Sequence, residues 1–391
     1  YFYDENQFIK NITTINNALS KNFQKFHICY TIKANSNPSI IKKMKSVIPN
    51  LGADCSSPGD LYAAQLGGIS TTECIFTGNY ESEDDLKTAL NSGAHINLDD
   101  ITSFHRLKKI GIPKEISFRL NPGFGKGAFK QIITGGKNSK FGIPKDFIID
   151  AYRLAKNNGI KKFGIQCMTG SGILDIKYFT LLIQEILKTV DLITKKLKIE
   201  FNHISIGGGY GIPYRSNEET INFDKMFKNI SRVFYSYFKQ QHKPELWIEP
   251  GRSIIGNAGI LISKVTGIKK SYKNFIGLDA GMETLIRPAL YNSYHEIYKI
   301  GDPDAIPIQT IDFTGRICEN TDRLAIDRPF PKIDEGELVA IMDTGAYGFS
   351  MSNQFCNRPR AAEVLFNGRR SSLIRNRETV ENIFYKCLDK N

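Results

Sequence analysis

The amino-acid sequence predicts a protein of the α/β plus β class, in which a (β/α)8 barrel is followed by a mostly β C-terminal domain. Three observations support this prediction. Eight short apolar runs occur in the first two thirds of the chain, amphipathic stretches separate them, and the alternation stops near Ser253. Such alternation is typical of parallel sheets covered by helices, and eight strands close most simply into a barrel.

The eight predicted strands are short and rich in β-branched and aromatic residues. In chain order they cover residues 28–32, 52–55, 74–77, 95–98, 116–120, 163–167, 203–206 and 246–249. Helical spacing of apolar residues marks the stretches between them, such as 37–47, 57–67, 82–93 and 223–241. A further helix is expected at about residues 5–19, before the first strand.

The pattern after residue 252 changes to strands joined by turns, with little helix. We therefore assign residues 20–252 to the barrel and residues 253–391 to the β domain. Whether residues 1–19 pack on the β domain is left open at this point.

The composition is that of an ordinary globular protein, with 41% hydrophobic and 24% charged residues among 391. The net charge of +12 comes from lysines spread along the chain, so we expect no nucleic-acid partner. No apolar run reaches the roughly 18 residues of a membrane span, and no signal-peptide pattern opens the chain. The seven cysteines lack metal-ligand spacing, which favours reduced thiols in the cytoplasm and predicts no metal site.

Polar or glycine-rich residues follow most of the predicted barrel strands. They include Lys33 after the first strand, Asp54 and Arg119 at the ends of the second and fifth, and the segments 168–172, 207–211 and 249–253 after the last three. Because active sites of such barrels lie at the carboxyl ends of the strands, we expect these residues to meet in one site.

Lys33 is unusual at the end of an apolar strand, where no acid stands near it in the sequence. The glycine triplet 207–209 suits a phosphate, because its amides can approach an anion closely, although many glycine turns are only turns. Glu249 follows the next strand and suits a pyridine nitrogen that must stay protonated, the alternative being a capping or salt-bridging acid. A lysine amine that forms a Schiff base completes a set of groups that predicts pyridoxal 5'-phosphate.

The sequence resembles the alanine-racemase-like, or fold III, pyridoxal phosphate decarboxylases, and within them it is most similar to the diaminopimelate decarboxylases. The resemblance covers essentially the whole chain. Its motifs include YTIKANSNP, GADCSSPGDLYAA, FRLNPG, KFGIP, IGGGYGIPY, EPGRSI, GMETLIRPALYNSYHEI, GRICENTD and DTGAYGFSMSNQFCNRPRAAEVL.

The resemblance implies a role for each matching residue. Lys33 matches the Schiff-base lysine, and Cys318 matches a catalytic thiol that should be partly exposed, unlike the other six. The positions matched to cofactor binding are Lys33, Asp54, Arg119, Met168, Ser171, Gly207, Gly208, Gly209, Glu249, Gly251, Arg252 and Tyr347. Those matched to substrate binding are Arg252, Arg287, Tyr291, Glu319 and Tyr347.

The implied reaction is the decarboxylation of meso-2,6-diaminopimelate to L-lysine and carbon dioxide, the last step of lysine biosynthesis. Arginines suit the far carboxylate of this substrate, because guanidinium binds carboxylates with two hydrogen bonds. Cys318 and Glu319 match a pair supplied by the second subunit, so the resemblance implies a homodimer with a shared active site. Either Cys318 or the released Lys33 amine could return a proton to the substrate.

The chain departs from the family in two places. Gln166 and Met168 stand where histidines are common, one of which stacks on the cofactor ring, and Arg316 with the following ENTD replaces a smaller, proline-containing turn. A thioether can still lie against an aromatic ring. These changes leave open a decarboxylase for ornithine, arginine, D-lysine, D-ornithine or a carboxylated polyamine precursor. A non-catalytic cofactor carrier would not need the β domain, and a racemase would need a tyrosine base for which no motif is present.

Overall fold

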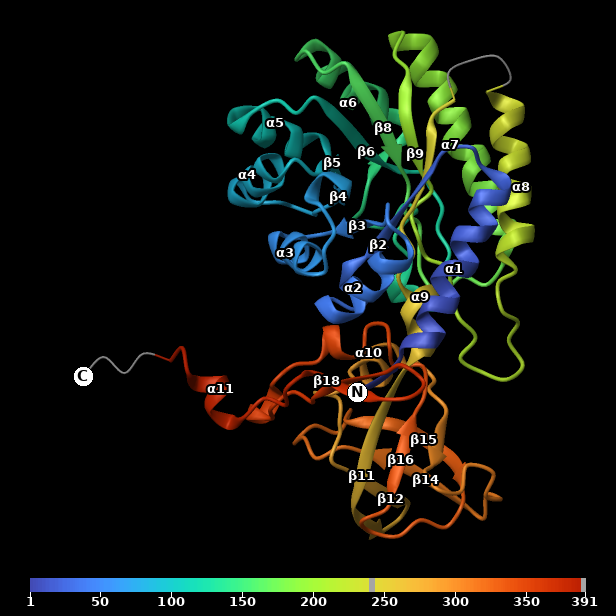
Figure 1. Ribbon diagram of the computed structural model, residues 1–391, viewed down its shortest axis with the longest axis vertical. Helices are drawn as coiled ribbons and strands as arrows, with labels where there is room; N and C mark the ends of the chain where they lie inside the picture. Colours follow the sequence, from blue (N-terminus) through green and yellow to red (C-terminus); the bar gives the residue numbers. More distant parts are fainter. Residues whose placement is uncertain (239–242, 388–391) are drawn as a thin grey trace. The chain divides into compact units, whose positions relative to one another are not determined.

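The computed structural model describes residues 1–238 and 243–387 (Figure 1). The chain divides into two compact units. The barrel unit contains Ile9–Ile212 and Glu219–Ser253, and the β unit contains Tyr1–Phe8, Pro213–Glu218 and Ile254–Asn391. The last part of the predicted helical stretch 223–241 and the last four residues of the predicted β domain lie outside the described residues.

Eight parallel strands close into a barrel, as the sequence predicts. Their order around the barrel is β2 (Phe26–Thr31), β3 (Gly52–Cys55), β4 (Cys74–Phe76), β5 (His95–Leu98), β6 (Glu115–Asn121), β8 (Lys162–Gln166), β9 (Phe201–Ser205) and β10 (Glu245–Ile248). The pairing of β5 with β6 and of β10 with β2 makes the ring continuous. A two-residue strand that the sequence did not predict, β7 (Ile143–Pro144), is added beside the end of β6.

Helices cover the outside of these strands (Figure 1). They are α2 (Pro38–Val47), α3 (Pro58–Leu66), α4 (Glu83–Ser92), α5 (Ile101–Ile110), α6 (Lys145–Asn157), α7 (Ile176–Leu197) and α8 (Phe223–Tyr237). Side-chain caps fix several of their first turns: Asn37 caps α2, Ser57 caps α3, and Ser82 forms a capping box with Asp85 in α4. These helices therefore begin at defined residues, which fixes the length of the loops between them and the carboxyl ends of the preceding strands.

Polar residues alternate with apolar ones along several barrel strands. Ser117 Oγ in β6 donates to Asn97 Oδ1 in β5 at 2.7 Å, and Asn97 Nδ2 donates to Thr77 Oγ1 at 3.2 Å. The neighbours of these polar residues along the strands, such as Ile96 beside Asn97 and Phe118 beside Ser117, are buried and apolar. Because successive side chains of a strand point to opposite faces, one face of these strands packs on the helices while the other lines a polar part of the interior.

The β unit is built on the long strand β11 (Gly259–Lys270). The sheet runs in the order β15 (Arg323–Phe330), β14 (Gln309–Thr314), β12 (Asn274–Leu278), β11, β1 (Phe2–Asp4), β17 (Glu363–Phe366) and β18 (Ser371–Arg375). The strand β16 (Leu338–Ile341) pairs with β11 and with β13 (Ile297–Lys299). Strand β1, which the sequence did not predict, lies between β11 and β17 and makes residues 2–4 part of this sheet.

Helices are short in the β unit, as expected from the sequence. They are α10 (Arg287–Tyr291) and α11 (Val380–Phe384). The opening helix α1 (Glu5–Asn22) extends three residues beyond the predicted end, and α9 (Arg252–Ile255) follows the last barrel strand. Among residues 1–238 and 243–387, no helix is both long enough and apolar enough to cross a membrane.

Candidate active site

Lys33 lies at the carboxyl end of the barrel, in the short 3-10 turn Ile32–Ala34 that follows β2. Its Nζ atom lies 2.9 Å from Asp54 Oδ2 and 3.2 Å from Ser56 Oγ. The acid that is missing near Lys33 in the sequence is thus supplied by the neighbouring strand β3, where Asp54 is buried. The Lys33 side chain is 46% exposed, so its amine is accessible to a ligand while it remains paired.

Glu249 is a buried carboxyl just beyond β10, and both of its oxygens accept hydrogen bonds. Ser205 Oγ in β9 donates to Oε1 at 2.5 Å, and Gln166 Nε2 in β8 donates to Oε2 at 2.8 Å. Burial and the nearby charge of Asp54 raise the pKa of Glu249 to about 7, against the opposing effects of Ser205, Gln166 and Lys33. This carboxyl can therefore gain or lose a proton near neutral pH.

The glycine triplet follows β9 in a backbone conformation that requires glycine. Gly207 and Gly209 have φ angles of +65° and +87°. A Cβ atom at Gly208 would lie 2.0 Å from the Glu249 carbonyl oxygen, and one at Gly209 would lie 2.2 Å from the Gly170 carbonyl oxygen. The triplet is therefore packed between the loops after β8 and β10, with no side chain of its own to cover its backbone.

Two further predicted residues meet beside this turn. Arg252 Nη2 lies 3.4 Å from Ser171 Oγ. The adjacent Ser253 hydroxyl is buried and has no hydrogen-bond partner among the described residues. A Cβ at Gly251 would come within 2.9 Å of the Ala34 Cβ, so the segment after β10 packs directly on the turn that carries Lys33.

Arg119 and Met168 fix the loop after β8. The buried Arg119 pairs with Asp99 at 3.3 Å, and its Nη2 donates to the Met168 carbonyl oxygen at 2.9 Å. The Met168 Sδ atom accepts a hydrogen bond from the Gly208 amide at 3.4 Å. Met168 thus links its own loop to the glycine triplet, and its side chain is half-buried.

Arg287 lies in the β unit, where it is 1% exposed. Its Nη1 donates to His295 Nε2 at 3.0 Å, and His295 Nδ1 in turn donates to the Met342 carbonyl oxygen at 2.7 Å. The guanidinium lies over the Tyr214 ring, with 4.9 Å to the centroid. Tyr291 ends the same short helix, α10, and is half-buried.

Cys318 and Glu319 lie on an exposed turn of the β unit. Buried Asp322 holds this turn, because its carboxylate accepts the amides of Ile317 at 2.9 Å and Met282 at 2.6 Å. Tyr347, the remaining predicted residue, also belongs to the β unit and has a φ angle of +59°.

The expectation that Cys318 would differ from all six other cysteines is wrong in part. Cys29, Cys55, Cys74 and Cys167 are buried, as expected, but Cys356 and Cys387 are exposed like Cys318. Cys356 lies in the short 3-10 turn Phe355–Asn357 and Cys387 follows α11, so neither of these two is buried in a strand. Exposure alone therefore does not distinguish Cys318.

The barrel unit brings together Lys33, Asp54, Arg119, Met168, Ser171, the glycines 207–209, Glu249, Gly251 and Arg252, whereas the remaining five predicted residues belong to the β unit. Sequence reasoning missed two polar partners, Ser205 and Asp99, and it included Ser253 only as the end of the segment 249–253 without a role of its own. Ser205 and Asp99 each stand two residues from a polar strand position, so the alternation of polar residues was the available signal. Gln166 was noted as a departure, but its hydrogen bond to Glu249 was not foreseen.

The fit of these residues to pyridoxal phosphate can be tested on the barrel unit alone. A reactive amine, a carboxyl that titrates near neutral pH and a glycine turn lie around one end of the barrel. The Ser253 hydroxyl, which follows Arg252 in the chain and has no hydrogen-bond partner among the described residues, is a donor available to an anion. These groups suit the aldehyde, the pyridine nitrogen and the phosphate of that cofactor, respectively.

Comparison with known proteins gives consistent results. Residues 9–256 match the family model described as "Pyridoxal-dependent decarboxylase, pyridoxal binding domain". A diaminopimelate decarboxylase of Methanothermobacter thermautotrophicus is 38% identical over 98% of this chain and 90% of its own length. The crystal structure of diaminopimelate decarboxylase from Helicobacter pylori, complexed with L-lysine, has a TM-score of 0.88 at 30% identity, over 98% of this chain and 95% of that one. The corresponding M. jannaschii structure with L-lysine has a TM-score of 0.89 at 28% identity, over 99% and 91% of the two chains.

The raised pKa of Glu249 predicts a pH-dependent stability of the cofactor-free protein. The folded state holds this proton more tightly than the unfolded state, whose carboxyl has the ordinary pKa of 4.5. Its contribution to stability is therefore full below pH 4.5 and is lost as the pH rises to about 7. In Glu249→Gln this loss is absent, so the free energy of unfolding of the variant relative to the native protein should rise over that range, by on the order of 3 kcal/mol.

Urea unfolding at a series of pH values measures this difference. Glu219→Gln, which changes an exposed glutamate in the same way, controls for the loss of one charge. A difference between Glu249→Gln and the native protein that stays constant from pH 4.5 to pH 7 would contradict the prediction.

Proposed function

Because the chain belongs to the pyridoxal-dependent decarboxylases, and within them to the diaminopimelate decarboxylase family, we propose that it decarboxylates meso-2,6-diaminopimelate to L-lysine and carbon dioxide with pyridoxal 5'-phosphate. The observation that carries this proposal is the extent of the similarity. It covers 98% of the chain, including the β unit, whereas a barrel by itself would not specify a substrate.

The residues of the barrel unit would hold the cofactor by its three functional parts. Lys33 would bind the aldehyde carbon, since its amine is accessible at the carboxyl end of β2. The backbone of the triplet Gly207–Gly209, with Ser171 and Arg252, would hold the phosphate. Asp54 keeps the amine in place through its 2.9 Å contact, and the β-unit residue Tyr347 would add a contact to the phosphate.

Glu249 would hold a proton against the pyridine nitrogen. Its two donors, Ser205 and Gln166, fix the orientation of the carboxyl and limit the rise of its pKa. When bound, pyridoxal phosphate supplies an electron sink for the electron pair left by the departing carbon dioxide, and a protonated ring nitrogen strengthens that sink. The register of β8, β9 and β10 thus determines which donors reach the Glu249 carboxyl, and through them its orientation toward the pyridine nitrogen.

The product requires a proton at the carbon that has lost carbon dioxide. Two groups of this chain have the right chemistry to deliver it: the Lys33 amine once it is released, and the exposed thiol of Cys318. We assign the distal end of the substrate to Arg252, Arg287 and Tyr291 for the carboxylate, and to Glu319 for the ammonium.

We further infer that the protein works as a homodimer in the cytoplasm, with Cys318 and Glu319 completing the site of the other subunit. The exposure of this pair on the Asp322-supported turn is compatible with such a role. The seven free thiols suit a reducing compartment.

The proposed substrate predicts the outcome of a parallel product assay. Purified holoenzyme given meso-diaminopimelate, L-ornithine, L-arginine or D-lysine should release carbon dioxide and form L-lysine from diaminopimelate alone. Lys33→Ala should lose both the activity and the near-visible absorbance of the bound cofactor, because no amine is left to hold it. Lys42→Ala, which changes an exposed lysine of α2, should retain both.

Preferential turnover of any of the other three amino acids would contradict the assigned substrate. Unchanged absorbance of the bound cofactor in Lys33→Ala would contradict the role of the lysine even if the substrate were correct.

The shared site predicts that two inactive variants complement each other. In a mixture of Lys33→Ala and Cys318→Ala, half of the reassembled dimers contain one intact site, so about a quarter of the native activity should return. Cys356→Ala, which also removes an exposed thiol, should be active without any partner variant. Absence of recovery would place Lys33 and Cys318 in the same subunit's site, and full turnover by Cys318→Ala alone would remove the thiol from the mechanism.

A further inference from the structure

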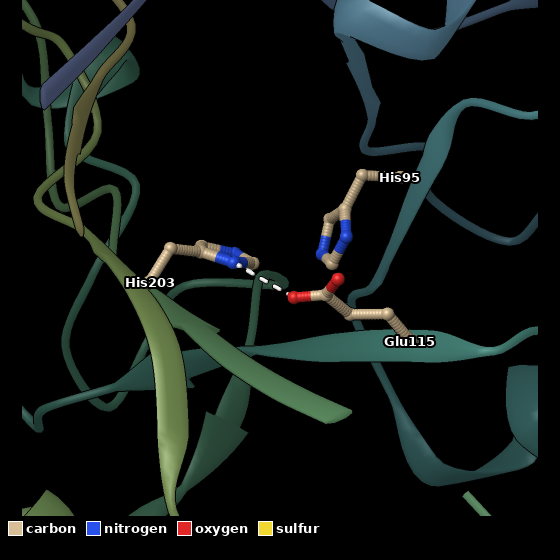
Figure 2. Close-up of side chains that lie close together, drawn as sticks. All are labelled: His95, Glu115 and His203. Atoms are coloured by element: carbon tan, nitrogen blue, oxygen red, sulfur yellow. Dashed lines mark ion pairs between the residues drawn. The ribbon is translucent and has the colours of Figure 1, made fainter. Parts of the chain in front are cut away.

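Two histidines and a glutamate meet at the end of the barrel opposite to Lys33. His95 and Glu115 are the first residues of β5 and β6, and His203 is the third residue of β9. Figure 2 shows the three side chains pointing toward one another, with the nitrogen-bearing edge of His203 turned to Glu115. Because all barrel strands run in the same direction, this cluster lies at their amino ends, and the proposed decarboxylation does not use it.

The donor atoms of the cluster lie close together. One atom from each of His95, Glu115 and His203 lies within 4.8 Å of the other two. His203 Nδ1 is 3.4 Å from Glu115 Oε1, and the two imidazole rings are perpendicular, with 4.4 Å between their centroids. Imidazole and carboxylate are the donors that bind zinc and neighbouring divalent metals in proteins.

His203 carries an unsatisfied polar atom in this cluster. The residue is 2% exposed, and its Nε2 has no hydrogen-bond partner among the described residues. A buried polar atom without a partner costs about 1–3 kcal/mol, so most such atoms in native proteins find one. A cation bound at Nε2 would give this nitrogen a partner, whereas the neighbouring side chains, of which Glu115 faces Nδ1, leave it without one.

The surrounding residues hold the rings in place. A Cβ atom at Gly164 in β8 would lie 2.0 Å from His203 Cε1, so the strand between β6 and β9 has no side chain where the His203 ring lies. On its other side the ring stacks on Trp247, with 4.1 Å between centroids. His95 Nε2 lies 2.9 Å from Ser117 Oγ, which itself donates to Asn97. Metal-binding histidines are commonly oriented by neighbours of this kind.

We propose that His95, Glu115 and His203 bind one divalent transition-metal ion, with zinc as the reference occupant, at the amino end of the barrel. Ligands about 2.1 Å from one tetrahedral zinc ion lie about 3.4 Å apart, so donors that are up to 4.8 Å apart would approach one another by up to about 1.4 Å through rotation of their side chains.

The ion would link β5 and β6 to β9 past the intervening strand β8, whose Gly164 leaves room for the His203 ring. This link would stabilise the folded barrel. Its position at the amino ends of the strands separates it from Lys33 and Glu249 at the carboxyl ends. The site therefore predicts an effect on stability and not a step in the decarboxylation.

Zinc titration of the holoenzyme tests this proposal. After treatment with a chelator and its removal, Zn²⁺ alone is titrated by calorimetry, and one ion per chain should bind with a rise in the melting temperature. His203→Gln and Glu115→Gln should each weaken this binding more than about tenfold, since the loss of even an orienting neighbour costs that much. His105→Gln, which changes an exposed histidine of α5, should bind zinc like the native protein.

Replacement of zinc by Co²⁺ in the native holoenzyme identifies the ligands and does not depend on the folding of any variant. A visible d–d spectrum without thiolate charge transfer is expected for a site of imidazole and carboxylate. Thiolate charge transfer would assign the metal to the exposed cysteines and overturn the proposal. Native protein that binds no more zinc than His203→Gln, or that gains no thermal stability from it, would also overturn it.

Discussion

Burial of the Glu249 carboxyl inside the barrel costs free energy that only well-placed hydrogen-bond donors can offset. The donors come from two other strands, Ser205 in β9 and Gln166 in β8, and the two residues are paired in register. A slip of one residue in either strand would turn its donor toward the helices and leave the carboxyl unsatisfied. The register of the barrel wall and the chemistry at its carboxyl end therefore depend on the same interaction.

The alternation that presents these donors also explains how the barrel divides its interior. Its polar positions carry the residues that we propose to hold the cofactor at the carboxyl ends of the strands, and the histidine cluster at the amino ends. Between them, Ser117, Asn97 and Thr77 satisfy one another in a continuous set of hydrogen bonds. A polar interior of this kind costs stability relative to an apolar core, and close pairing limits that cost. Among the described residues, the polar atoms without a hydrogen-bond partner include the Ser253 hydroxyl and His203 Nε2, which lie beside the two places where we propose a ligand.

The sequence predicted those features that depend on local pattern. The eight barrel strands and the positions of Lys33, the glycine triplet and Glu249 could be located because each stands directly after an apolar run. Contacts between strands could not be located, because they depend on the register and on which face of a strand a residue occupies. The pairing of Lys33 with Asp54 and the hydrogen bond from Ser205 to Glu249 are examples. The metal-type cluster was missed for the same reason, because its ligands come from three separate strands and show no local spacing. Strand β1 is too short for any periodicity and acquires its pairing only from β11 and β17.

We propose that the Glu249 carboxyl keeps the pyridine nitrogen of the cofactor protonated. The nitrogen-15 NMR shift of holoenzyme loaded with pyridoxal phosphate labelled at the ring nitrogen measures the protonation state of that nitrogen. The native protein at pH 8 should show a protonated nitrogen with the shift of a pyridinium, and Glu249→Gln should show the shift of a neutral pyridine. A neutral nitrogen in the native protein, or a pyridinium that persists in Glu249→Gln, would contradict this account of the site.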